Sequence, residues 1–235
     1  MKKILITLIA MTILLVTSCS VNNLKKKFTK MTSDIPTNHS MPIDNHELTI
    51  TMLPDESIFM CSDRIIVNRN EIKKQLFTAI ALNKNVELSS VFVNGISSII
   101  QELSGYDNRY FGNSLTKKQL SNIQNNCNLY EIGLPAYAEN DSLATIEIKY
   151  IIDLNKKFAN SILNDNSFIL SSSDAIFPLS YRKDAPATIK VIVPKKYEVT
   201  VNSEEGVLIK ENNLIKTMKF KVFSSLLDFR IIGTK

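Results

Sequence analysis

Residues 187–235 read ATIKVIVPKKYEVTVNSEEGVLIKENNLIKTMKFKVFSSLLDFRIIGTK, and this stretch decides the fold expected for the end of the chain. β-Branched and aromatic residues recur there in short runs, at 188–193, 197–201, 206–209, 217–223 and 227–232. Turn-forming residues separate the runs at Pro194, 203–206 and 211–213. Such repetition predicts an antiparallel β meander. Lysines at 190, 195, 196, 219 and 221 would discourage edge-to-edge association of its strands.

Toward the N-terminus, apolar residues recur instead at helical spacing. Residues 70–84, NEIKKQLFTAIALNK, predict one helix, and residues 88–103 predict a second that tolerates Gly95 and ends at Gly105. A third, weaker helix is predicted from Ser114 through Cys127. Ahead of these helices, residues 48–52 and 59–67 predict two strands.

The segment 143–153, LATIEIKYIID, fits two interpretations. Its apolar residues alternate as in a strand, and a subset of them also recurs at helical spacing. The density of β-branched residues favours a strand, followed by a short helix through Leu163. The expected fold class is therefore α+β, with a helix-rich first half and an antiparallel β meander in the last third. One continuous core is expected over residues 47–235, with two sub-lobes, 47–164 and 165–235, as the alternative.

The first twenty residues, MKKILITLIAMTILLVTSCS, have the three regions of an export signal. A lysine pair precedes the apolar run 4–16, which is too short to cross a hydrocarbon core of about 30 Å as a helix. The exit Val16-Thr17-Ser18-Cys19 resembles the lipobox of bacterial lipoproteins. The resemblance implies a signal peptide at 1–18 and a lipid on Cys19. Because Ser20 replaces the aspartate of inner-membrane retention, it also favours the outer membrane. An ordinary secretory signal or an uncleaved anchor is the alternative.

Residues 19–46 are predicted to form a lipidated flexible tether, since polar residues dominate and Pro36 and Pro42 interrupt regular structure. The chain has 28 Lys and Arg against 23 Asp and Glu, a formal net charge of +5. Lysines at 2, 3, 25, 26, 27 and 30 supply much of this excess. We expect those of the tether to lie against anionic headgroups. The remaining body is close to neutral, so nucleic acid is not an expected partner.

Cysteine and histidine limit the chemistry of the body. After Cys19, two cysteines remain, Cys61 and Cys127, which an exported compartment would allow to pair as a disulfide. Two buried free thiols are the alternative. The only histidines, His39 and His46, lie in the predicted tether or at its edge. Catalysis by Ser-His-Asp or Cys-His sets is therefore excluded for the body beyond residue 46, and neither a metal site nor a cofactor is expected.

Two further motifs could carry a function. Ser114 and Lys117 have the S-x-x-K spacing and resemble the nucleophile motif of penicillin-binding proteins and β-lactamases. The rest of that pattern fails, because Lys216-Thr217 is followed by Met218, and Ser114 also suits a helix N-cap. The glycine-framed loop 105–113 contains residue types common in interface hot spots: Tyr106, Arg109, Tyr110 and Phe111. This loop either folds back onto the body or binds a partner.

The expected function follows from these features. We expect a lipid-anchored protein of the bacterial envelope that binds or assembles with another macromolecule, held to the membrane through the lipid on Cys19. No enzymatic activity is expected. The alternative is a histidine-free hydrolase that uses Ser114 and Lys117 or a pair of carboxylates. The acidic clusters at 55–56 and 139–141 are better explained as solvated loops.

Overall fold

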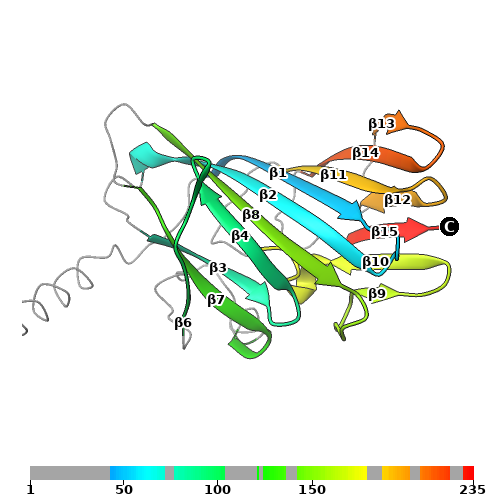
Figure 1. Ribbon diagram of the computed structural model, residues 1–235, viewed down its shortest axis with the longest axis horizontal. Helices are drawn as coiled ribbons and strands as arrows, with labels where there is room; N and C mark the ends of the chain where they lie inside the picture. The colour runs from blue at the N-terminus through cyan, green and yellow to red at the C-terminus, as the bar shows by residue number, and fades with distance from the viewer. Residues whose placement is uncertain are drawn as a thin grey trace, which may run out of the picture. The chain divides into compact units, whose positions relative to one another are not determined.

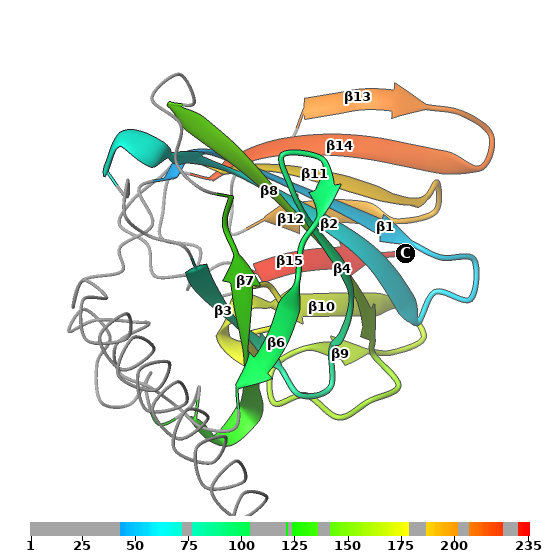
Figure 2. The same ribbon diagram turned by 60° about the vertical axis from the view of Figure 1, so that its left-hand side comes forward.

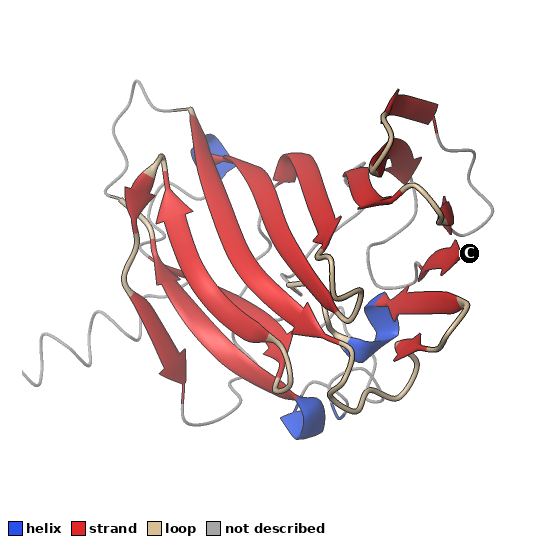
Figure 3. Ribbon diagram, turned by 45° about the vertical axis from the view of Figure 1, so that its right-hand side comes forward, coloured by secondary structure: helices blue, strands red, loops and turns tan. Residues whose placement is uncertain are grey.

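The computed structural model describes residues 43–71, 77–103, 121, 124–135, 142–178, 187–201, 207–222 and 230–235. Residues 38–235 belong to one compact unit. Strands dominate the described residues, and the helical turns among them are short (Figure 3). The predicted α+β class is therefore wrong: the first half of the chain is rich in strands, not in helices.

An eight-stranded sheet, here called the large sheet, dominates the body (Figure 1). Its strand order is β13-β14-β11-β1-β2-β8-β4-β5. In that order the bounds are Val207–Glu211, Ile215–Val222, Ala187–Pro194, Ile43–Met52, Ile58–Asn68, Leu143–Asp153, Glu87–Val93 and Ile96–Ser97. All neighbours are antiparallel except β1 and β11, which are parallel.

Two smaller sheets pack on one face of the large sheet (Figure 2). The four-stranded sheet has the order β12-β15-β10-β9, with bounds Glu198–Val201, Arg230–Thr234, Ser167–Ser171 and Ile162–Leu163. The three-stranded sheet has the order β3-β7-β6, with bounds Phe77–Asn83, Cys127–Gly133 and Ile100–Leu103. Short 3-10 turns, η1 (Arg69–Glu71) and η4 (Ser172–Asp174), complete the described elements.

The core lies between the large sheet and the two smaller ones. Side chains of a strand point alternately to its two faces, and β2 and β8 alternate strictly between buried and more exposed positions. The buried face is called inner here, and the opposite face outer. On the inner side, the Phe59 and Phe168 rings lie 5.0 Å apart between centroids, and the Phe168 and Tyr197 rings 5.4 Å. A Cβ at Gly233 would overlap the Phe168 ring, so this close packing requires glycine there.

The two helices predicted in the first half are absent from the described parts of 70–103. Residues 77–83 form β3, and residues 88–103 form β4, β5 and β6. The decisive signal is Asn94-Gly95, where both residues have positive φ (53° and 78°), as the two-residue turn of a β-hairpin requires. Asn94 donates its backbone N–H to the Thr145 carbonyl (2.8 Å), and its side-chain oxygen accepts the Thr145 N–H (2.9 Å). Tertiary contact with β8 thus overrides the helical spacing.

The remaining secondary-structure predictions are confirmed for three strands and wrong for one short helix. The strands predicted at 48–52, 59–67 and 143–153 are confirmed as parts of β1, β2 and β8. The short helix predicted to end at Leu163 is wrong, because that residue lies in β9. Of the predicted third helix, residues 121 and 124–126 are helical, and β7 begins at Cys127.

The predicted C-terminal meander is wrong in its pairing. The runs it comprised do contain strands, but these divide between two sheets: β11, β13 and β14 join the large sheet, and β12 and β15 join the four-stranded one. The parallel pair of β1 and β11 unites the two ends of the body in one sheet. The boundary considered between sub-lobes, at 164/165, falls inside the β9–β10 hairpin.

Candidate functional site

Several residues singled out from the sequence lie outside the described part of the chain. They are Cys19, Tyr106, Arg109, Tyr110, Phe111, Ser114, Lys117, Glu139 and Asp141. The loop 105–113 nevertheless follows β6 closely along the chain, since that strand ends at Leu103.

Cys61 and Cys127 are both free and buried, which is the alternative to the predicted disulfide. Cys61 lies on the inner face of β2, and Cys127 is the first residue of β7. Burial raises the pKa of Cys61 far above its ordinary value and that of Cys127 to about 12. Because the thiolate is the nucleophilic form, neither thiol is suited to attack a substrate at neutral pH.

His46 lies in the core rather than at the edge of a tether, because β1 begins at Ile43. Its Nε2 contacts the carboxylate of Asp63, which is also buried on the inner face of β2. The second carboxylate oxygen, Asp63 Oδ2, has no hydrogen-bond partner. Tyr150 lies opposite Cys61 in the register, and burial raises its pKa well above its ordinary value, with Cys61 and Asp63 adding to the effect. These polar residues are thus sealed inside the core.

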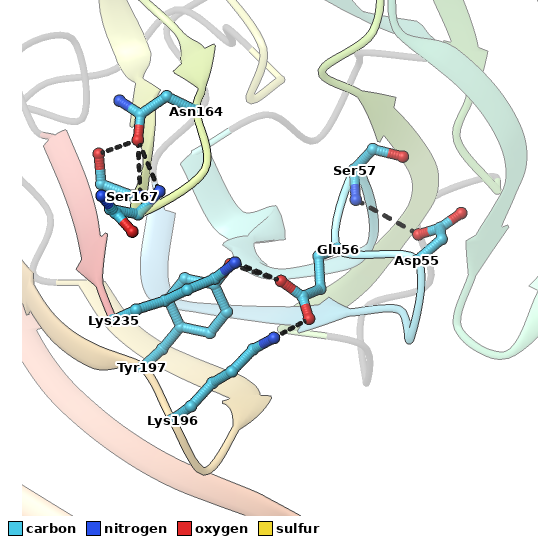
Figure 4. Close-up of polar contacts among 9 residues, drawn as sticks. Asp55, Glu56, Ser57, Asn164, Ser167, Lys196, Tyr197 and Lys235 are labelled. Atoms are coloured by element: carbon cyan, nitrogen blue, oxygen red, sulfur yellow. Dashed lines mark hydrogen bonds and ion pairs between the residues drawn. The ribbon is translucent and has the colours of Figure 1, made fainter.

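A second polar cluster fastens the β1–β2 turn to the four-stranded sheet and is called the Glu56 clamp (Figure 4). Glu56 has a φ of 62° and accepts a hydrogen bond from the Tyr197 hydroxyl at 2.8 Å. The ammonium groups of Lys196 and Lys235 pair with the same carboxylate, the latter at 3.2 Å. Both ammonium groups also lie near the Tyr197 ring, at 5.7 and 5.5 Å from its centroid, within the range of cation–π attraction.

The clamp is built for cohesion rather than proton transfer. The Glu56 carboxylate accepts a hydrogen bond from Lys196. This bond, together with those from Tyr197 and Lys235, lowers the pKa of Glu56 to about 2. Burial, together with the hydrogen bond to Glu56, raises the pKa of Tyr197 to about 12. A general acid or base works best with a pKa near the operating pH, and neither group has one near neutrality. The neighbouring Asp55 accepts the N–H groups of Ser57 and Ile58, each at 3.3 Å, and so belongs to the hydrogen bonding of its own turn.

An exposed apolar site lies where the chain crosses from the large sheet to the three-stranded one. This stretch, residues 96–100, is called the crossover edge. Ile96 and Ile99 are 73% and 85% exposed. Ser98 donates its N–H to the Val91 carbonyl (2.9 Å) and its hydroxyl to the Gly133 carbonyl (3.0 Å), and Gly133 donates its N–H to the Ile99 carbonyl (3.3 Å). Bonds to both sheets therefore hold the two isoleucines outward.

The spacing of apolar residues was misleading for the crossover edge. Helical spacing assigned Ile96 and Ile99 to the buried face of a helix, whereas the hairpin exposes them. Asn94-Gly95 flanked by apolar residues was the signal that could have identified the hairpin. No comparable signal marks the exposure of Ile99, which depends on the switch between sheets.

Comparison with known proteins provides a fold but no family. No family model and no curated protein matches the sequence. Among similar solved structures are an M1 zinc metallopeptidase from Deinococcus radiodurans (TM-score 0.57, 13% identity, 84% of this chain and 43% of that one) and a mutant of that enzyme bound to a Tyr-Ser-Ala substrate (0.58, 14%, 83% and 42%). Native LTA4 hydrolase from Saccharomyces cerevisiae is also similar (0.56, 12%, 83% and 29%). The chain spans less than half the length of each of these proteins, and the likeness concerns the fold alone.

The histidines of this sequence do not fit a zinc centre of the H-E-x-x-H type. A zinc site of the H-E-x-x-H type needs two histidines four residues apart, whereas the only histidines of this sequence are His39 and His46. His46 is engaged by Asp63 in the core. Within the described ranges, no group of three or more His, Cys, Asp and Glu side chains could hold a metal ion. No helix in those ranges is long and apolar enough to cross a bilayer.

Proposed function

We propose that this protein is a lipid-anchored component of the bacterial cell envelope whose β-rich body is a binding or assembly module for a partner protein. The observation that carries the binding role is the crossover edge, where two isoleucines are held in water by hydrogen bonds to two sheets. Large apolar side chains in fixed positions gain free energy when a partner covers them and lose little conformational entropy on binding.

The chemistry of the buried and clamped groups supports a binding role over hydrolysis. In the described part of the chain, each ionisable group whose pKa departs from its ordinary value has that pKa displaced away from neutrality: Glu56 and Glu211 downward, and Cys61, Cys127, Tyr150 and Tyr197 upward. A group that transfers protons or attacks a substrate would need a pKa displaced toward neutrality.

A photo-crosslinking residue at position 99 in living cells tests the proposed interface. We expect it to capture a discrete protein, and we expect position 60 to capture none. Met60 is a matched control because it is also apolar and is 52% exposed, but it lies on the outer face of β2 within the large sheet. Capture at neither position 99 nor position 110 would contradict the proposal.

The double variant Ile96→Asp with Ile99→Asp sharpens this test. Truncating a hot-spot residue typically costs at least 2 kcal/mol, about thirtyfold in affinity, and we expect a loss of at least this size. Met60→Asp should leave capture unchanged. Tyr106, Arg109, Tyr110 and Phe111 are proposed to extend the same interface, because they follow β6 in the chain.

Lipidation of Cys19 has a separate test. A fatty-acid probe supplied to cells should label the wild-type protein and not Cys19→Ala. Labelling of that variant to the wild-type level would contradict the proposed anchor, without affecting the proposed interface at position 99.

A second candidate function is peptide recognition, which the fold likeness to metallopeptidases favours. Calorimetric titration with short unmodified peptides tests it. Saturable binding that competes with partner capture would replace the assembly role by peptide binding.

A further inference from the structure

The opposite edge of the large sheet, formed by the β13–β14 hairpin, is also exposed and apolar. All five residues of β13 are exposed, on both faces of the strand. Val207, Leu208, Ile209 and Leu214 have 69%, 48%, 52% and 78% of their surface in solvent. The Asn212 side chain accepts the N–H groups of Leu214 (2.9 Å) and Ile215 (2.8 Å), and Lys195 donates its N–H to the Leu214 carbonyl (2.9 Å). The turn therefore holds Leu214 outward at the tip.

Four exposed lysines lie on the outer face beside these side chains. The register places Lys190 of β11 opposite Lys219 of β14, and Lys219 opposite Val207 of β13. Lys221 follows two residues later on the same face, and Lys210 lies opposite Thr217. Like charges on directly opposed residues destabilise a sheet. In the described part of the chain, none of these four lysines has an ion-pair partner.

Lysines of the same region that lie elsewhere are paired. Lys195 contacts Glu211 at 3.0 Å, and Lys216 pairs with Glu198. Among the described lysines of this region, those without an ion pair therefore lie on the outer face, where they adjoin the exposed aliphatic side chains. A body of nearly balanced overall charge thus concentrates basic residues at one corner.

We propose that this corner, comprising the β13–β14 hairpin and Lys190, docks on an anionic lipid bilayer. Aliphatic side chains at a protruding tip can enter the boundary between headgroups and acyl chains, while flanking lysines contact the phosphates. The same corner suits other occupants less well. Single-stranded nucleic acid stacks its bases on aromatic side chains, which β13 lacks. A second copy would bring lysine clusters together, and the irregular register between Leu208 and Lys210 disrupts the edge that it would pair with.

Docking by this corner would give the body a defined orientation on the bilayer. It requires neither the lipid on Cys19 nor the interface at Ile99. The two proposals can therefore fail separately.

A local probe in the full chain tests the docking. Leu214→Cys, made together with Cys19→Ser, is labelled with an environment-sensitive thiol dye, because Cys61 and Cys127 are buried. We expect a blue shift of the emission on adding vesicles of phosphatidylcholine with phosphatidylglycerol, and none with phosphatidylcholine alone. Ile99→Cys, labelled in the same background, is the matched control and should not shift. Since the signal is local, it does not depend on how the N-terminus meets the vesicle.

Lysine variants test the electrostatic part. Lys190→Ala with Lys219→Ala should weaken the vesicle titration monitored at position 214 by about 25-fold, since each lysine near an anionic surface accounts for about fivefold. Thermal stability should not fall, because the variant removes a repulsive pair. A fall in stability with unchanged vesicle response would overturn the proposal.

Three further outcomes would also overturn it: no shift at position 214 with either vesicle, an equal shift with phosphatidylcholine alone, or a shift that depends on protein concentration without vesicles. The last outcome would identify a second copy as the occupant. A shift produced by single-stranded DNA in place of vesicles would identify a nucleic-acid surface instead.

Discussion

The two edges of the large sheet resemble each other in hydrophobicity and differ in charge. At the β5 edge, Ile96 and Ile99 are exposed beside Gln101 and Glu102, and at the β13 edge the exposed aliphatic residues adjoin four lysines. Exposed apolar area alone does not specify a partner, because it gains free energy in any contact that excludes water. The neighbouring charge is the basis on which we propose different partners: a protein for the first edge and an anionic lipid surface for the second.

The edges also differ in how they are supported. The crossover edge is held by backbone hydrogen bonds to two sheets. The β13 edge pairs only with β14, and its turn is fixed to the β11–β12 turn, which the Glu56 clamp joins to the β1–β2 turn. A variant in the central strand β1 should therefore affect both edges. A variant in the Glu56 clamp should affect only the β13 edge, and a variant in the β4–β5 turn only the β5 edge.

The largest effect is expected for His46→Ala, which should weaken both edges equally. β1 lies inside the large sheet, between the two edges, and the variant leaves Asp63 buried without a partner for either oxygen. Removing one member of a buried pair typically costs 3–5 kcal/mol. Urea unfolding measures the loss. The double variant His46→Ala with Asp63→Ala should lose less than the sum of the two single variants, and strict additivity would show that the pair is not coupled.

A smaller effect, on the β13 side alone, is expected for Glu56→Gln. The folded-state pKa of Glu56, about 2, lies below its ordinary value of 4.5, so the ionised clamp stabilises the protein above pH 4.5. This contribution is lost as the pH falls from about 4.5 to about 2, and the variant should lack that dependence. We expect a loss of about 2 kcal/mol at neutral pH, since solvent screens the half-exposed Lys196.

Hydrogen exchange locates this effect. In Glu56→Gln, the protection of backbone amides from exchange should fall around the β11–β12 turn and stay unchanged around the β4–β5 turn. Glu211→Gln is the matched control, because Glu211 also pairs with a lysine but is exposed, and it should change stability less. Equal changes at both turns would contradict a local role of the clamp.

The smallest effect, on the β5 side alone, is expected for Gly95→Ala. A Cβ at this position meets nothing within 4 Å, so only the positive φ of 78° opposes the substitution, at a cost of about 1 kcal/mol. Crosslinking from position 99 should decrease, and the vesicle response at position 214 should not. Gly133→Ala is the control, because its Cβ would make ordinary contacts. A greater loss for Gly133→Ala in urea unfolding would contradict this account.

The strands were predictable where their residues alternate on a half-buried surface. In β2 and β8 the buried and more exposed positions alternate strictly, because one face meets the core and the other meets solvent, and the polar and apolar residues at 47–52 and 145–150 follow the same alternation. The pattern failed for residues 88–103, where the inner residues of β4 are followed by two exposed isoleucines and a change of sheet. Such a mixture imitates helical spacing, and the Asn94-Gly95 turn was the local evidence against a helix.

The candidate sites were less predictable than the strands. Neither the exposure of Ile99 nor the opposition of Lys190 and Lys219 follows from the composition of their segments. Residues 190 and 219 meet because β14 returns to pair with β11 while β12 leaves for another sheet. Likewise, Glu56 meets Lys196 and Lys235 only through the packing of the four-stranded sheet on the large one.

By itself the sequence determined the lipobox-like leader, the small number of histidines and the alternation at 47–52 and 145–150, because these depend only on composition or on neighbouring residues. Only the tertiary structure decided which strands share a sheet, that His46 is buried and that Lys190 lies opposite Lys219. The reason is physical: pairing and burial depend on residues distant in the chain, such as Ile50 and Val191 in the parallel pair of β1 and β11. A local pattern describes the surface that a strand presents, and the fold decides what that surface meets.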